Sequence, residues 1–129
     1  MRYYLDTAPI VYTVETSPLF AQRVDVVLNR AGVIPITSEM ARLECRVKPM
    51  RDGNSILLKD FDDYFNNTIA EIVSLTRDVV DKATEIRAQF NFKTPDSFHL
   101  AAALVSKCDV FLTNDQRLNR FTGITIEIV

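Results

Sequence analysis

Short apolar segments typical of strands alternate along this chain with longer segments of helical periodicity. This alternation limits the fold more than any other feature of the sequence. Strands rich in β-branched and aromatic residues are expected at residues 2–5, 33–37, within 69–75, 109–113 and 124–129. Helices are expected at residues 18–31, 54–66, 76–90 and 94–107, with shorter helices after Asp6 and from Ser38. The alternation indicates an α/β layered fold with a mainly parallel sheet.

Local signals mark the ends of several of these helices. Asp6 (or Thr7), Ser38 and Thr76 have side chains that cap a helix N-terminus well. Thr94 is expected to cap the last long helix, because a proline follows it directly. Proline disfavours helical backbone in the residue before it, so the helix from Ser38 is expected to end near residue 47, ahead of Pro49.

Composition gives no sign that the chain is divided or disordered. Of its 129 residues, 47% are hydrophobic and 25% are charged, and no Gly/Ser-rich or Pro-rich linker is present. We therefore expect one domain over residues 1–129 with one sizeable core. The formal net charge of −2 gives no global basic signature for nucleic acid, although a local basic patch would suffice for binding.

The cysteines and the N-terminal segment bear on the cellular compartment. Cys45 and Cys108 form no Cys-x-x-Cys motif, and with one histidine in the chain a zinc site is not favoured, so both are expected to be reduced thiols. The first residues, MRYYLDTAPI, do not have the form of a signal peptide, and no apolar run is long enough to span a membrane. We expect a cytoplasmic protein without a membrane segment.

Four acidic residues occupy positions where a parallel α/β sheet forms its sites. Asp6 ends the first strand and Asp115 follows the fourth, and sites in such sheets lie beyond the carboxyl ends of the strands. Asp96 lies in the first turn of a helix with an apolar face, and Glu44 lies among Ala41, Leu43 and Cys45. Each also has a local explanation: a helix cap for Asp6, the helix dipole for Asp96, a turn for Asp115 and a surface position for Glu44.

Clustered carboxylates imply a particular chemistry. They repel one another, so bringing them together requires a compensating cation. An all-oxygen ligand set suits hard cations such as Mg²⁺ or Mn²⁺. Such an ion activates water and stabilises a leaving oxygen, which points to hydrolysis of a phosphate ester.

Four segments of the chain carry a family resemblance. LDTAPIVY, SEMARLECRVKPMR, KTPDSFHLAAAL and DVFLTNDQRL occur in this order and cover essentially the whole chain. In this order they resemble PIN-domain ribonucleases of the VapC toxin type, and TPDSFHLA followed by FLTND is the most specific part. The resemblance implies a three-layer α/β/α sandwich with a mainly parallel central sheet. It also implies a metal-dependent endoribonuclease, the toxin of a toxin–antitoxin pair.

The resemblance assigns roles to individual residues. Asp6, Glu44, Asp96 and Asp115 match the catalytic, metal-binding acids, with Mg²⁺ or Mn²⁺ as cofactor. Thr113 or Asn114 matches the polar residues that support the last acid. Glu39 competes with Glu44 for the helix position; five residues apart, the two point about 140° from each other on a helix, and the family pattern favours Glu44.

Two positions near these acids qualify the assignment. Some members carry a further acid a few residues past Asp115, where this chain has Gln116, Arg117, Leu118 and Asn119, so one metal or two stays open. His99 lies three residues after Asp96. The position is commonly histidine in the family without being held catalytic, so we expect a structural hydrogen-bonding role.

RNA and protein partners follow from the resemblance. Basic residues near the acids are candidate RNA contacts, with a solvated basic surface as the alternative: Arg42, Arg46, Lys48, Arg51, Lys93, Arg117 and Arg120. Aromatic side chains are expected mainly in the core, with base stacking or a partner helix as alternatives: Tyr12, Phe61, Tyr64 and Phe65. A cognate antitoxin and a homodimer are the expected protein partners.

Two other functions are open at this stage. One is a binding module that keeps the fold but has lost activity, against which the intact set of four acids counts. The other is a metal-dependent phosphatase, whose family commonly has a second Asp two residues after the first. Here that position is Ala8.

Overall fold

The computed structural model describes residues 1–129 and contains one five-stranded sheet in the order β3-β2-β1-β4-β5, with every pair parallel. The strands are β1 (Arg2–Leu5), β2 (Ile34–Ser38), β3 (Glu71–Val73), β4 (Val110–Thr113) and β5 (Thr125–Ile128). All five lie within the predicted segments or within one residue of them, and the predicted α/β class with a parallel sheet is confirmed.

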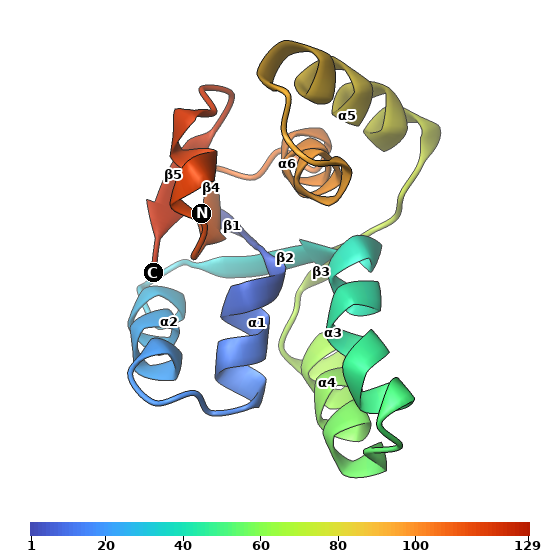
Figure 1. The fold of residues 1–129 in the computed structure, drawn as a ribbon. Coiled ribbons are helices and arrows are strands. Elements are labelled where there is room, and N and C mark those ends of the chain that lie inside the picture. Colours follow the sequence, from blue (N-terminus) through green and yellow to red (C-terminus); the bar gives the residue numbers. More distant parts are fainter.

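Helices cover both faces of the sheet and complete a three-layer α/β/α fold (Figure 1). One layer contains α1 (Thr7–Val14), α2 (Phe20–Leu28), α3 (Glu39–Arg51) and α4 (Ser55–Asn67). The opposite layer contains α5 (Arg77–Phe90) and α6 (Thr94–Val105). A 3-10 helix, η1 (Gln116–Arg120), connects β4 to β5.

The central strand β1 shows why both faces of the sheet are covered. Tyr4 packs into the core beneath α5 and α6, whereas Tyr3 and Leu5 pack into the core beneath α1 to α4. Successive side chains of a strand point to opposite faces, so a strand buried on both sides is apolar at nearly every position. That is why β1 and β4 read as short, nearly continuous apolar runs, whereas the edge strand β5 alternates in the segment TIEI.

The strand order brings distant acidic residues together. β1 pairs with β2 on one side and β4 on the other, and Leu5 is in register with Leu112. The chain winds outward in both directions from β1, and such a reversal leaves a crevice beyond the strand ends. Asp6 and Asp115, which follow these two strands, therefore lie at the same edge of the sheet.

Two helix-boundary predictions were wrong, and the predicted N-cap at Ser38 was right in position only. α3 continues two residues past the buried Pro49, to Arg51, although the proline removes one backbone donor. Ser38 occupies the N-cap position of α3 without a capping bond; its hydroxyl instead accepts from Tyr4 Oη. The N-cap of α6 is Lys93 rather than Thr94. The predicted caps at Asp6 and Thr76 are confirmed.

None of the helices combines the length and the apolar character that crossing a membrane requires. Both cysteines are free, as predicted.

Candidate active site

A cleft at the carboxyl edge of the sheet brings the predicted acids together. It has a volume of about 380 Å³ and is lined by Asp6, Thr7, Ala8, Val11, Tyr12, Glu44, Asp96, His99 and Asp115. Its walls come from the start of α1, the inner face of α3, the first turns of α6 and the loop after β4. All four predicted acids line this one cleft although they are far apart in the sequence.

Asp6 is held in place by the elements on both sides of it. Its Oδ1 accepts from the Thr7 backbone N–H at 2.8 Å, which caps α1, and its Oδ2 accepts from Thr113 Oγ1 at 2.8 Å. Thr113 Oγ1 in turn accepts from the Asp115 backbone N–H at 3.0 Å. Thr113 thus links two acids, as its predicted supporting role requires. Asn114 does not: its side chain donates to the Val129 carbonyl at 2.6 Å and ties the loop to the chain end.

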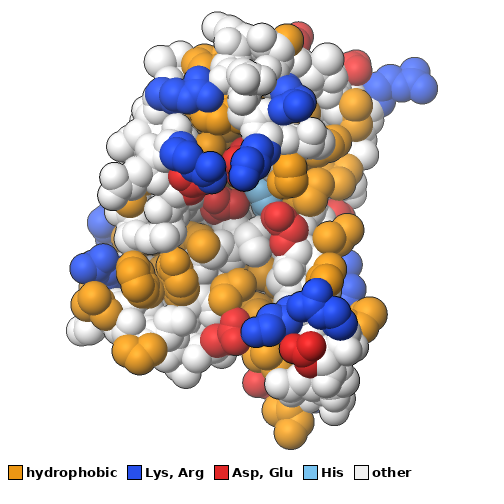
Figure 2. All heavy atoms as spheres, viewed as in Figure 1, with side chains coloured by type: hydrophobic (Ala, Val, Ile, Leu, Met, Phe, Trp, Pro, Cys, Tyr) orange, Lys and Arg blue, Asp and Glu red, His pale blue; other side chains and the backbone are white.

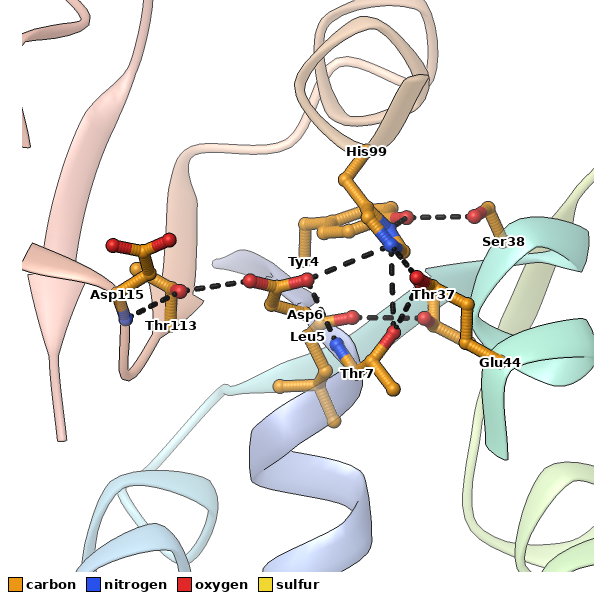
Figure 3. Close-up of polar contacts among 10 residues, drawn as sticks. All are labelled: Tyr4, Leu5, Asp6, Thr7, Thr37, Ser38, Glu44, His99, Thr113 and Asp115. Atoms are coloured by element: carbon orange, nitrogen blue, oxygen red, sulfur yellow. Dashed lines mark hydrogen bonds and ion pairs between the residues drawn. The ribbon is translucent and has the colours of Figure 1, made fainter. Parts of the chain in front are cut away.

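His99 anchors Glu44 through a buried chain of hydrogen bonds (Figure 3). Tyr4 Oη donates to Ser38 Oγ and lies 2.7 Å from His99 Nδ1. His99 Nε2 lies 2.5 Å from Glu44 Oε1, and an ionised carboxylate only accepts, so Nε2 is the donor of this bond. Both ring nitrogens of His99 are thus engaged in hydrogen bonds, which is consistent with the structural role expected for it.

The charges in this network stabilise one another. Burial lowers the pKa of His99, but the hydrogen bond to Glu44 and the negative charges of Asp6 and Asp96 outweigh burial and raise it. Burial raises the pKa of Glu44, but hydrogen bonds from His99 and Thr7 outweigh it and leave that pKa lowered. The contact between His99 and Glu44 therefore favours the charged form of each group.

Among the four acids of the cleft, Asp96 has the carboxylate whose negative charge is least neutralised by groups of the chain. Its pKa is raised, first by burial and then by the negative charges of Asp6 and Asp115. His99 and Arg117 oppose this rise only in part, and no hydrogen bond from the chain contributes. A carboxylate in this position gains from an added cation.

Asp115 differs because an arginine neutralises it. Arg117 lies 2.6 Å away through Nη2 and 3.0 Å away through Nε, and its backbone N–H donates to Oδ1 at 3.0 Å. The side-chain hydrogen bond from Arg117 is the main reason that the pKa of Asp115 is lowered.

The donor set of the cleft fits a hard divalent cation. All four acids offer oxygen ligands, which suit Mg²⁺ or Mn²⁺, and Asp96 carries repulsion that a cation would relieve. However, no three His, Cys, Asp or Glu side chains are arranged as a ligand set. The physical reason is that Asp6, Glu44 and Asp115 are each turned toward donors of the chain itself.

The structure separates the two candidate glutamates of α3. Glu44 faces the cleft, whereas Glu39 pairs with Arg42 at 2.9 Å and lines a groove on the outer face of α3. That outer groove is larger, at about 420 Å³, but carries none of the four acids. Geometry thus agrees with the choice of Glu44.

The candidate RNA contacts fall into two groups. Arg42 and Arg46 line the outer groove, where Arg46 pairs with Asp62 at 2.8 Å. Lys48 lines a hollow that shares Glu44 with the cleft, and Lys93 is close enough to help lower the pKa of Asp115. Figure 2 shows Lys and Arg side chains gathered around acidic side chains and the histidine on this face.

Sequence reasoning considered Thr7 only as an alternative helix cap, but it lies at the centre of the site. Its hydroxyl donates to Glu44 Oε1 at 2.8 Å while its backbone N–H holds Asp6. The only signal in the sequence is its place directly after Asp6. Of the four aromatic residues considered, Tyr12 alone lines the cleft, whereas Phe61 and Phe65 are core residues.

Comparison with known proteins agrees with this geometry. The chain superposes on VapBC2 from Rickettsia felis bound to a DNA fragment from its promoter with a TM-score of 0.80, at 16% identity over 99% of this chain and 98% of that one. A toxin–antitoxin complex from Klebsiella pneumoniae gives 0.76 at 15% identity, covering 95% of both chains. Mycobacterium tuberculosis VapC20, a toxin that cleaves the sarcin-ricin loop, gives 0.70 at 12% identity, covering 94% and 90%.

These likenesses, at low identity, establish the fold. No curated protein matches the sequence. A family model described as "PIN domain" matches residues 3–124, nearly the whole chain. This protein belongs to the PIN domain family.

Proposed function

We propose that this chain is a metal-dependent endoribonuclease acting as the toxin of a toxin–antitoxin pair, with residues 1–129 as one domain. The observation that carries the proposal is the convergence of Asp6, Glu44, Asp96 and Asp115 on one cleft of a PIN fold. Structural relatives described as toxins, one of them cleaving the sarcin-ricin loop, favour RNA as the substrate.

Asp6, Asp96, Asp115 and Glu44 would hold Mg²⁺ or Mn²⁺. When bound, the ion supplies Lewis-acid activation of water and charge stabilisation at the phosphate. The chain's own residues position the site: Thr113 holds Asp6, and His99 with Thr7 holds Glu44. Lys93 and Lys48 lie where they can contact the RNA backbone, and Tyr12 offers a ring for a base.

An antitoxin is the proposed protein partner, since one structural relative is a toxin–antitoxin complex. The acidic cleft suits a partner that brings a basic side chain to it. Expressed alone in a bacterial host, the chain should slow growth, and its antitoxin should restore it. Normal growth with soluble, folded protein would argue for a nuclease that is not a toxin. Homodimer formation is also proposed, and light scattering of the purified chain tests it.

The cleft itself disfavours the phosphatase alternative. Ala8, which stands where such phosphatases commonly carry their second acid, lines the cleft and offers no ligand or proton donor. The inactive-module alternative has to explain why four carboxylates line one cleft against their mutual repulsion.

The test compares two glutamates of the same helix. Glu44→Gln replaces a carboxylate that faces the cleft, and Glu39→Gln makes the same chemical change on the outer face of α3. With fluorogenic RNA and Mn²⁺, we expect Glu44→Gln to lose about a hundredfold or more in rate, in the range seen when a general acid–base or ligand group is removed. Glu39→Gln should keep wild-type activity, and EDTA should stop cleavage until excess metal is added. Full activity in EDTA would refute the proposal.

A further inference from the structure

Asp115 forms a salt bridge with Arg117, two residues further along the chain. Both carboxylate oxygens are engaged by Arg117, Oδ1 by Nε at 3.0 Å and Oδ2 by Nη2 at 2.6 Å. This is the two-point geometry in which a guanidinium binds a carboxylate most specifically. Arg117 thus occupies the oxygens through which Asp115 would bind a metal.

The neighbouring acids have no cation that binds them in this way. Asp96 receives only longer-range effects from His99 and Arg117, and Asp6 accepts from neutral donors with His99 Nε2 3.6 Å away. His99 has both ring nitrogens engaged and is only 2% exposed, so it cannot leave its place. Lys93 acts on Asp115 by charge without a hydrogen bond to it. Arg117 is therefore the exposed cation that directly occupies a proposed metal ligand.

Arg117 is also placed so that it can release Asp115. Its side chain is 67% exposed, and it belongs to the short helix η1 rather than to the core. Exposed ion pairs contribute little to stability, because water solvates both partners well when they separate. Release of Asp115 therefore needs no rearrangement of the fold.

We propose that Arg117 is an internal counter-cation that competes with the divalent metal for Asp115 and so lowers the metal affinity of the site. The inference rests on the proposed function, since it takes Asp115 as a metal ligand. A divalent ion at Asp115 either displaces the guanidinium or shares the carboxylate with it against like-charge repulsion. The site then fills only at higher metal concentration than its carboxylates alone would require.

The experiment measures metal binding rather than cleavage. Mn²⁺ is titrated into wild type, Arg117→Gln, Arg117→Lys and Arg51→Gln, followed by calorimetry and by the rise in melting temperature. Arg51 is the charge-matched control, because it is 68% exposed and pairs with Asp52 at the end of α3. We expect Arg117→Gln to bind Mn²⁺ about fivefold more tightly, because metal binding to wild type has to break one exposed ion pair. Arg51→Gln should match wild type, and the gain should shrink at high salt.

The outcomes distinguish this inference from the proposed function. If wild type and Arg117→Gln both fail to bind Mn²⁺, the metal site itself is refuted. If wild type binds but Arg117→Gln binds equally or less tightly, Arg117 is not a competitor. Arg117→Lys keeps the charge without the two-point contact, so its Mn²⁺ affinity should lie between those of wild type and Arg117→Gln. Equal gains in the Lys and Gln variants would show that the charge is not the cause. A change confined to RNA affinity in EDTA would make Arg117 a phosphate contact only.

Discussion

Tyr64 carries a hydroxyl that the fold buries without satisfying. It lies beside Thr13, and neither side-chain oxygen makes a hydrogen bond of good geometry. Burial, followed by the negative charge of Asp25, raises the pKa of Tyr64 to about 12 from 10.0. The aromatic ring packs against the core beneath α1 to α4 rather than facing the cleft, so the sequence alternative of base stacking does not apply to this residue.

Tyr64→Phe should be at least as stable as wild type near pH 7, because an unpartnered buried hydroxyl gains nothing from burial. At alkaline pH the two should diverge. Between pH 10 and 12 the unfolded chain loses the phenolic proton before the native chain does, so wild-type stability falls as pH rises. The variant should lack this loss, which approaches about 2 kcal/mol by pH 12. Urea unfolding at several pH values measures it, and parallel pH profiles for the two proteins would contradict the account.

The positions of the acids could be predicted from the sequence where a local pattern fixed them. Asp6, Asp96 and Asp115 stand at strand ends or in a first helical turn, and helix geometry kept Glu39 and Glu44 from sharing a face. The partners could not be predicted, because they depend on side-chain directions across elements. Nothing in the sequence indicates that the side chain of Arg117 turns toward Asp115.

At the scale of elements, strand β1 joins the two cores to the site. Tyr3 and Tyr4 are adjacent and chemically identical, but they point to opposite faces of the sheet. Tyr4 Oη bonds both Ser38 and His99 and is buried, whereas Tyr3 Oη makes one long contact with Arg30 at 3.4 Å. The hydroxyl of Tyr4 thus connects the sheet to the helix that carries His99.

Tyr4→Phe should destabilise the protein by about 1–3 kcal/mol, because it leaves the buried Nδ1 of His99 without its hydrogen-bond partner. Tyr3→Phe on the same strand is the matched control and should change stability by less than about 0.5 kcal/mol. Chemical denaturation of the three proteins measures the difference. Equal effects of the two substitutions would show that the hydrogen-bond chain to His99 contributes nothing to stability.

The helices and strands could be predicted because hydrophobic periodicity and capping residues are local in the sequence. The errors in these predictions lie at the helix ends. Pro49 was expected to stop α3, yet the helix continues two residues past it and its ring is buried. Ser38 is a good cap by type, but its hydroxyl has a better partner in Tyr4, which lies 34 positions away in the chain. Non-local partners of this kind are not encoded in a sequence window.

At the scale of the whole molecule, the strand order brings the acids of the site together. In the metal-free protein, these carboxylates repel one another. Placing β4 beside β1 brings Asp115 to Asp6, and packing α6 on the sheet adds Asp96. Parallel pairing was predictable from the alternation of elements, but the strand order was not, since it depends on which crossovers pack best. The central claim is that these carboxylates converge for a divalent cation.

Asp96→Asn tests that claim most directly, with thermal melts in EDTA and in Mn²⁺ alongside one RNA-cleavage assay. The metal-free variant should melt at or above the wild-type temperature, because it removes a charge that Asp6 and Asp115 repel. Mn²⁺ should raise the wild-type melting temperature by mass action and the variant's much less, and the variant should not cleave RNA. Loss of a helix-dipole interaction alone would lower the free energy of unfolding by about 0.3–1 kcal/mol. An active variant with a correspondingly lower melting temperature would contradict the account.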